Sequence, residues 1–297
     1  MNFIKNPIKS NISFLELIKE CEDNFYLKPS SPKTEIIKKK FLNFYRKKIK
    51  KNKFTFKYDK NEKIVFPYIQ MGIPSSLGLF AYHEHNIFLY YLNNLKHYNK
   101  KVADIGANIG LHSIILSKIG YKVDAFEPDN NHIKLLKKNL KDNKCKNVKV
   151  FNKAIFDSNG SVEFIRVKGN TAANHISGYK ENLHGNVEKF KVGTLDIKKI
   201  VNKYDLIKLD AEGSEGKIIE RLNKKELEKV DIICEISGMK NAHKIYNHCK
   251  KNKINIFSHK VKWLKVKKLN DLPVHHSEGL IMITKKKIFM IDKNYVN

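Results

Sequence analysis

The stretch Lys101-Val-Ala-Asp-Ile-Gly-Ala-Asn-Ile-Gly-Leu-His112 combines the end of an apolar strand, a tight glycine turn and the start of a helix. A glycine turn before a helix usually binds an anion, because unpaired N–H groups and the helix dipole point towards the ligand. Here Asp104 places a carboxylate at the turn, and Asn108 replaces the second glycine of the dinucleotide pattern G-x-G-x-x-G. We therefore expect the turn to reject a pyrophosphate and to accept a ligand with both an ammonium and a carboxylate group, such as S-adenosylmethionine.

A second acidic residue follows at the spacing of one strand–helix–strand unit. Residues 122–126 form a short apolar segment that ends in Glu127. An acidic residue about 20 positions after a glycine turn usually accepts hydrogen bonds from ribose hydroxyls. The alternative is a nucleotide-free unit whose glycines only allow close packing. Because the glycine turn and the acidic strand end occur together, we favour a ligand that contains a nucleoside.

The composition is that of a globular chain with an excess of lysine. With 297 residues, of which 41% are hydrophobic, the chain can bury a core. It contains no apolar run long enough to span a membrane, no signal-peptide pattern and no C-x-x-C pair, so we expect a cytoplasmic protein with reduced thiols. The net charge is +28, but almost all positive residues are lysines. Phosphate and base recognition favours arginine, so nucleic acid is a less favoured partner and compositional bias the favoured explanation.

Hydrophobic periodicity divides the chain into two parts. Residues 1–80 are expected to form an N-terminal extension with helices at 11–22 and from 34 onwards and a hairpin over 54–68. Its basic and aromatic residues could contact RNA, although an amphipathic helix and hairpin with solvated lysines is the favoured interpretation. Residues 81–297 alternate between helices and strands, which is typical of an α/β domain with a mostly parallel sheet and helices on both faces. The expected strands are 101–105, 122–126, 148–151, 161–165, 205–209, 230–234, 254–257 and 279–284, and the expected helices are 85–95, 111–119, 132–142 and 242–251.

A second polar cluster follows the apolar segment 205–209. Asp210 and Glu212 are separated by one alanine, so an extended backbone would point both carboxylates to the same side. The pair could coordinate a divalent cation, act as a base or cap the next helix, and capping by Ser214 or Glu215 needs no catalysis. For Asp210 we favour a functional role, because ligands of such sheets bind at the carboxyl ends of the strands.

Three motifs in this order resemble the FkbM family of S-adenosylmethionine-dependent methyltransferases. They lie at 104–110, 126–129 and 207–215, and the resemblance covers about residues 82–285. It implies the class I methyltransferase fold, which is Rossmann-like with a seven-stranded, mostly parallel sheet. It also implies S-adenosylmethionine as the cofactor and O-methylation of a hydroxyl on a glycan, a sugar or another small molecule.

The resemblance also implies roles for single residues. The loop around the methionyl group would contain Asp104, Gly106, Asn108 and Gly110. Glu127 would hold the ribose hydroxyls, Asn152, Ala154 and Ile155 would line the adenine, and Asp210 would stand near the sulfonium. The candidate bases are Asp210, Glu212, His83, His85, His175, His275 and His276. Among the histidines we favour His275, because its cluster precedes the last expected strand.

Two other functions remain open at this point. An RNA 2′-O-methyltransferase would use the same cofactor and would explain the positive charge, and its binding would weaken strongly with added salt. A non-catalytic binding subunit would keep the fold without affinity for the cofactor. The sequence indicates no zinc site, because histidines at ligand spacing are missing. It does not indicate the acceptor or the oligomeric state.

Overall fold

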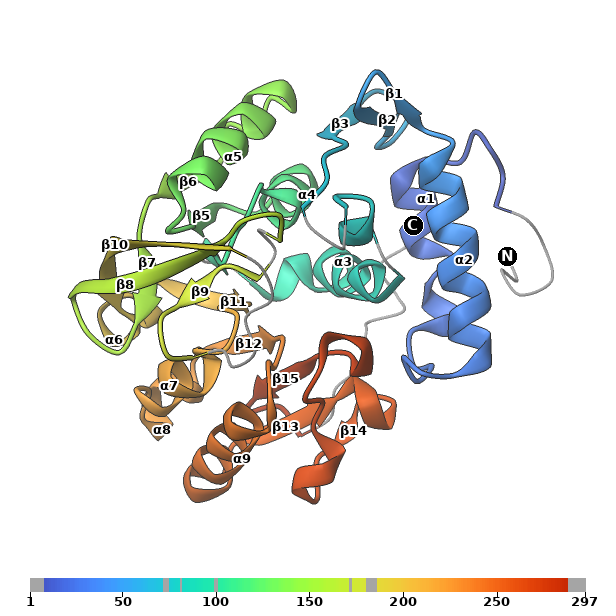
Figure 1. Ribbon diagram of the computed structural model, residues 1–297. Helices are drawn as coiled ribbons and strands as arrows, with labels where there is room; N and C mark the ends of the chain where they lie inside the picture. Colours follow the sequence, from blue (N-terminus) through green and yellow to red (C-terminus); the bar gives the residue numbers. More distant parts are fainter. Residues whose placement is uncertain are drawn as a thin grey trace.

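The computed structural model describes residues 8–71, 75–80, 82–98, 101–170, 173–179 and 186–287. Its centre is a twisted sheet with helices packed on both faces (Figure 1). The elements of this layer are β4 (Lys101–Ile105), α4 (Leu111–Ile119), β5 (Val123–Phe126), α5 (Asn130–Asp142), β6 (Val148–Phe151), β11 (Tyr204–Leu209), α7 (Glu215–Glu220), α8 (Lys224–Leu227), β12 (Asp231–Cys234), α9 (Met239–Asn252), β13 (Asn255–Ser258), β14 (Leu264–Lys265) and β15 (Ile281–Thr284).

The strand order of the central sheet is β14-β13-β15-β12-β11-β4-β5-β6. Neighbouring strands from β12 to β6 are parallel, whereas β15 is antiparallel to both of its neighbours. This arrangement confirms the predicted α/β class and the mostly parallel sheet. The expected seven strands of the sheet become eight, because the two residues of β14 pair with the edge strand β13.

A second sheet of four strands lies beside the central one. Its order is β7-β10-β8-β9, and β10 is antiparallel to β8 and parallel to β7. The sequence predicted only part of β8. Asp196 at the end of this sheet caps the short helix α6 (Ile197–Ile200). The four strands are β7 (Ala154–Phe156), β8 (Gly160–Val167), β9 (His175–Ile176) and β10 (Val187–Asp196).

The N-terminal residues pack onto the central layer through α3 (Tyr82–Asn94). The ring of Phe14 lies 5.7 Å from that of Phe88 on α3, and the side chain of Asn143 pairs with the backbone of Val65. The division of the chain at residue 80 stays a prediction, but the two parts share one hydrophobic core. The N-terminal elements are α1 (Phe14–Lys19), α2 (Pro32–Arg46), β1 (Ile49–Lys50), β2 (Lys53–Lys57) and β3 (Lys63–Pro67).

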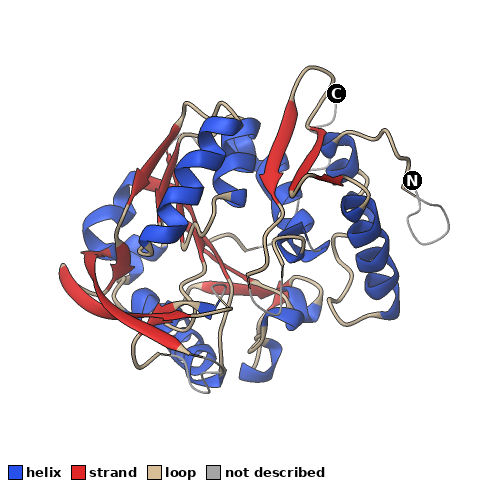
Figure 2. Cartoon of the chain, turned by 45° about the horizontal axis from the view of Figure 1, so that its top comes forward, coloured by secondary structure: helices blue, strands red, loops and turns tan. Residues whose placement is uncertain are grey.

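The N-terminal hairpin has the amphipathic character that was favoured from the sequence. Phe54 and Phe56 of β2 are buried, while the lysines that flank them are exposed. Buried rings cannot stack on nucleotide bases, so this hairpin does not provide an aromatic RNA-binding platform. The hairpin and the small sheet lie on opposite sides of the molecule, as Figures 1 and 2 show.

The central sheet separates two hydrophobic cores. Because side chains alternate along a strand, Leu206 of β11 faces the core that contains the N-terminal elements, whereas Ile207 and Leu209 face the core under the small sheet. Across the described ranges, no helix combines the length and apolar character that crossing a bilayer requires. All four cysteines are free thiols, and Cys21, Cys234 and Cys249 are buried.

Candidate functional site

A cavity of about 570 Å³, including its open mouth, lies at the carboxyl ends of β4, β5 and β11. The loops that follow these three strands form its floor, and residues 153–155 close one side. Phe164, Asn174 and Ile176 of the small sheet and the loop before β9 form the opposite wall. The small sheet, which the sequence analysis largely missed, therefore builds part of the site.

The glycine turn after β4 is held by the backbone of two other strands. The N–H groups of Gly106 and Ala107 both donate to the carbonyl oxygen of Phe126 at 3.0 Å. Gly106 has φ +75°, and a Cβ atom there would collide with the backbone oxygen of Asp210. Glycine is therefore required both by the left-handed backbone and by the close approach of the loop after β11. Gly106 and Asn108 border the cavity, and their contact with the methionyl group stays a prediction.

Gly110 does not border the cavity. It precedes the first residue of α4 with φ +94°, and a Cβ atom would collide with the side chain of Leu136 on α5. The structure thus gives this glycine a role in helix packing, while its role around the methionyl group stays a prediction.

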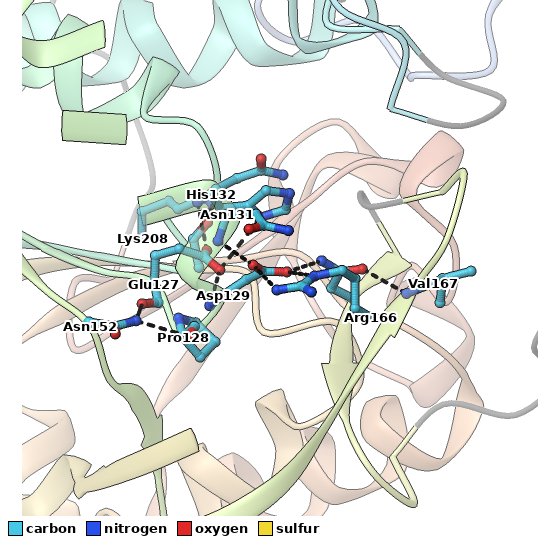
Figure 3. A network of polar contacts seen from close by, with 12 residues as sticks. Glu127, Pro128, Asp129, Asn131, His132, Asn152, Arg166, Val167 and Lys208 are labelled. Atoms are coloured by element: carbon cyan, nitrogen blue, oxygen red, sulfur yellow. Dashed lines mark hydrogen bonds and ion pairs between the residues drawn. The ribbon is translucent and has the colours of Figure 1, made fainter. Parts of the chain in front are cut away.

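Glu127 is fixed before any ligand arrives. Its Oε2 atom accepts from the backbone N–H of Asn108, and its Oε1 atom accepts from that of Asp129, both at 2.9 Å (Figure 3). Nδ1 of His132 also faces Oε1, at 3.5 Å, whereas Oε2 keeps a second lone pair that can accept a hydrogen bond from a hydroxyl. Because the side chain is buried and oriented at the cavity, its geometry suits the predicted contact with a ribose diol.

Asp104 lies behind the glycine turn and is fully buried. Ser113 donates to its Oδ2 atom at 2.6 Å, and the ammonium of Lys208 is 3.8 Å from its Oδ1 atom. Lys208 is the register partner of Asp104 on the neighbouring strand β11. Asp104 does not border the cavity, and Lys208 balances its charge. The expected repulsion of an anion by Asp104 is therefore weaker than its sequence position suggested.

Lys208 also connects the turn to the second polar cluster. Its Nζ atom donates to the carbonyl oxygen of Gly106 at 3.2 Å and to Oδ2 of Asp210 at 3.3 Å. Although burial lowers the pKa of Lys208, the negative charges of Asp210 and Asp104 outweigh burial and raise it. Lys208 is thus a charged residue that holds together the ends of β4 and β11.

Asp210 and Glu212 both border the cavity, although the backbone between them is not the extended one from which their common side was expected. Glu212 has a left-handed backbone with φ +48°, which turns the chain towards α7. Glu215 is buried behind them, and its Oε1 atom accepts from two backbone N–H groups of the same loop. Burial raises the pKa of Glu215 to about 8. Glu215 therefore shapes the loop, while Asp210 and Glu212 face the ligand space.

A smaller hollow of about 220 Å³, including the open solvent at its mouth, shares Asp210 with the cavity. Besides Asp210 and Lys208, it is lined by Glu84, Glu235 and apolar side chains. Burial raises the pKa of Glu235 well above its ordinary value, and the charge of Asp210 adds to this effect. Nε2 of His112 lies at hydrogen-bond distance from Oε2 of Glu84, at 2.8 Å. Asp210 is the acidic residue that the cavity and the hollow share.

The predicted histidines whose side chains the structure describes do not border the cavity. His85 is buried and bonded to the hydroxyl of Tyr45 at 2.7 Å, and His175 is buried with Nδ1 at 2.7 Å from the carbonyl oxygen of Ala173. His275 is exposed, because its imidazole turns back to Ser277 at the start of a short 3₁₀ helix. His276 is also exposed, and the side chain of His83 lies outside the described part of the structure.

Two further predictions can be compared with the geometry. Ala154 and Ile155 border the cavity, as expected for residues near the adenine. Asn152 does not; its side chain donates to the carbonyl oxygens of Glu127 and Pro128 at 3.1 and 3.0 Å. Asn152 therefore supports the turn behind Glu127. No sequence signal marked His132, which borders the cavity from the first turn of α5.

The chemistry of the cavity fits S-adenosylmethionine. Among the described residues, Asn108 Oδ1, His132 Nε2 and Asp210 Oδ1 are buried atoms without a hydrogen-bond partner, and all three residues border the cavity. Buried unpaired polar atoms are unfavourable, so their grouping indicates a polar ligand. The described residues contain no group of three histidine, cysteine or acidic side chains arranged to hold a metal ion.

A family model described as "Methyltransferase FkbM domain" matches residues 104–259, which is more than half of the chain. The chain belongs to the FkbM methyltransferase family. This membership confirms the resemblance that the three motifs indicated, and it confirms S-adenosylmethionine as the cofactor. The matched residues include the glycine turn, Glu127 and the Asp210 loop.

Solved structures similar to this FkbM protein are also methyltransferases. The FkbM methyltransferase from Methylobacillus flagellatus is 16% identical with a TM-score of 0.40, and the match covers 62% of this chain and 43% of that one. A putative S-adenosylmethionine-dependent methyltransferase from Streptococcus mutans is 12% identical with a TM-score of 0.41, and the match covers 79% and 55%. The chain thus spans about half the length of these proteins or less. A search of curated proteins found no match.

Proposed function

We propose that this S-adenosylmethionine-dependent methyltransferase methylates a hydroxyl group of a neutral, hydroxyl-rich acceptor such as a sugar, a glycan or another small molecule. The observation that carries the proposal is the position of Asp210, which borders both the cofactor cavity and the acidic hollow. An acceptor in the hollow would present its oxygen to the cavity beside this carboxylate.

Different residues of the cavity would bind different parts of the cofactor. Glu127 would accept the ribose hydroxyls, and the apolar side chains of Phe126, Ile155 and Phe164 would enclose the adenine. Gly106 would allow the backbone to approach the methionyl group. The bound cofactor supplies an electrophilic methyl group on a sulfonium. The chain's own contribution is to place the acceptor oxygen in line with that methyl group, which can account for most of the acceleration.

Asp210 is the proposed general base. An alcohol is a poor nucleophile near neutral pH, and a positioned base typically contributes about 10²–10⁴-fold. One carboxylate oxygen of Asp210 lies near Lys208, whereas Oδ1 has no partner among the described residues and can accept the hydroxyl proton. Glu212 borders the cavity but not the hollow, so a binding role suits it better than a role as the base.

The charge of the hollow supports a neutral acceptor. Its lining holds the carboxylates of Glu84 and Asp210, the carboxyl group of Glu235, whose raised pKa favours the uncharged form, and the ammonium of Lys208. Carboxylates accept hydrogen bonds from hydroxyls but repel phosphates. The alternative of RNA 2′-O-methylation is favoured by the net charge of +28, which would attract a polyanion to the surface.

The test is methyl transfer from labelled S-adenosylmethionine to separate pools of sugars and glycans, small hydroxyl compounds, and RNA. We expect label in a neutral pool at a rate that changes little between 50 and 300 mM salt, whereas label confined to RNA that falls steeply with salt would refute the proposed acceptor class. Calorimetric titration with S-adenosylmethionine is the control for a non-catalytic protein, which would not bind it.

A variant pair tests the base. Asp210→Asn should lower turnover by about 10²-fold or more while the affinity for the cofactor stays within a few-fold. Asp142→Asn, an exposed carboxylate at the end of α5, is the matched control and should behave as the wild type. If Asp210→Asn keeps full turnover, Asp210 is not the base.

A further inference from the structure

His132 is a buried polar residue at the cavity that none of the motifs includes. It lies in the first turn of α5, its side chain is only 6% exposed, and it borders the cavity next to Glu127. Figure 3 shows its ring in the same polar network as Glu127, Asp129 and Arg166. Its two ring nitrogens have different surroundings, and this difference carries the inference.

The Nδ1 atom of His132 faces Glu127 at 3.5 Å from Oε1. This contact fixes the orientation of the ring and places a proton on Nδ1. The Nε2 atom is buried and has no hydrogen-bond partner in the part of the chain that the structure describes. Burial and the positive charge of Arg166 lower the pKa of His132. The hydrogen bond and charge of Glu127 and the charge of Asp129 raise it more, so the pKa of His132 lies above its ordinary value.

Glu127 itself indicates which part of the cofactor lies near this ring. An acidic residue at the end of the second strand of such a unit binds the ribose hydroxyls. Because His132 touches the same carboxylate, its ring lies at the nucleoside half of the cavity and away from Asp210. Asn174 and Ile176 of the small sheet border the same cavity.

We propose that His132 is a nucleoside-binding residue, whose Nδ1 holds Glu127 in place and whose Nε2 forms a hydrogen bond with the ribose or adenine of S-adenosylmethionine. The inference rests on the cofactor assignment and is independent of the acceptor. A ligand atom at Nε2 would satisfy a buried group that otherwise stays unpaired, and this is the source of the expected affinity.

Two polar substitutions separate the ring nitrogens. The amide of His132→Asn reaches only the position of Nδ1, so the variant keeps the contact with Glu127 and loses the contact of Nε2. The longer His132→Gln places its amide near the position of Nε2. His243→Phe, an exposed histidine on α9, is the control for the loss of an imidazole outside the cavity. Calorimetry measures the dissociation constants of S-adenosylmethionine and of adenosine, and thermal unfolding confirms that each variant is folded.

We expect His132→Asn to weaken the binding of both ligands by the same factor, about five- to tenfold for one lost hydrogen bond. His132→Gln should stay within about twofold of the wild type, and so should the control. A folded His132→Asn protein with wild-type affinities would overturn the inference, as would a His132→Gln protein that binds as weakly as the Asn variant. A loss with S-adenosylmethionine but not with adenosine would also overturn it. If the wild type itself binds no S-adenosylmethionine, the cofactor assignment fails instead.

Discussion

Replacing Arg166 with methionine tests how the small sheet is attached to the cofactor cavity. Nε and Nη2 of Arg166 donate to the two carboxylate oxygens of Asp129 at 2.7 and 2.6 Å. Asp129 is fully buried and caps α5, and it also accepts from the side chain of Asn174 at 2.9 Å (Figure 3). Through this one carboxylate, β8 and the loop before β9 are joined to the turn that carries Glu127.

The expected loss of stability follows from the burial of the ion pair between Arg166 and Asp129. Removing one partner of a buried ion pair costs about 3–5 kcal/mol, because a charge stays buried without compensation. Here Asp129 keeps two other donors, from Asn131 N–H and Asn174, so the lower end applies. We expect Arg166→Met to lower the free energy of unfolding by about 3 kcal/mol. Because the wall of the cavity loosens, the affinity for S-adenosylmethionine should also fall.

Arg221→Met is the matched control. Arg221 also pairs with a helix-capping aspartate, Asp196, at 2.8 Å, but its side chain is 42% exposed, compared with 13% for Arg166. An exposed pair contributes at most about 1 kcal/mol. The assays are urea denaturation, calorimetric titration of the cofactor and hydrogen exchange of β8 and β9. Equal losses for the two variants, or a loss below about 0.5 kcal/mol for Arg166→Met, would refute the reasoning.

The pH dependence gives an independent check. Burial raises the pKa of Asp129, but hydrogen bonds from Arg166 and from the Asn131 N–H outweigh it and hold the pKa below its ordinary value. A lowered pKa in the folded state stabilises the protein above the unfolded pKa, and this stabilisation is lost as the pH falls through the folded pKa. The difference in the free energy of unfolding between the wild type and Arg166→Met should therefore be largest at neutral pH and should become smaller below about pH 4.

Two further predictions concern the loops of the site. Gly106→Ala should lower the free energy of unfolding by at least about 3 kcal/mol and abolish cofactor binding, because the added methyl group collides with the backbone of Asp210. The control is Gly178→Ala. Gly178 also has a positive φ but open space around it, so this variant should lose only about 1 kcal/mol. Glu215→Gln should become more stable than the wild type as the pH rises from about 5 to 9 in urea denaturation. In the folded protein the pKa of Glu215 is raised to about 8, so the wild type loses stability as the pH rises from the unfolded pKa to the folded pKa. If the free energy of unfolding of both proteins changed with pH in the same way, this prediction would be contradicted.

The central sheet could be predicted because its signals are local. Apolar strands, glycine turns and amphipathic helices alternate from 101 to 151 and again from 204 to 284, and each is visible within a short window. The small sheet lacked such a signal. The first half of β10, Val187–Lys191, is mostly exposed and charged, and it becomes a strand through its antiparallel register with β8. Pairing over this sequence distance cannot be inferred from periodicity.

The residues of the site could likewise be predicted only where the sequence around them carries a local signal. Glu127 and Asp210 could be found because each directly follows an apolar strand. Lys208 was overlooked, although a lysine within the apolar segment 204–209 is itself a signal, since a buried ammonium requires an acidic partner. Its acidic partners are Asp210, two residues further along the chain, and Asp104 on the neighbouring strand. His132 gave no signal, because only the orientation of α5 brings its ring to the cavity.

The position of β4 in the sheet has a consequence for the synthesis of the protein. β4 pairs with β5 on one side and with β11 on the other, and β11 begins about 50 residues after the end of β6. At about 5–20 residues per second, the ribosome needs roughly 3–10 s to deliver that second partner. During this interval the nascent chain presents an open strand edge of apolar residues, the kind of surface that pairs with other chains. A chaperone that covers this edge would protect the newly made protein until β11 pairs with β4 and completes the site.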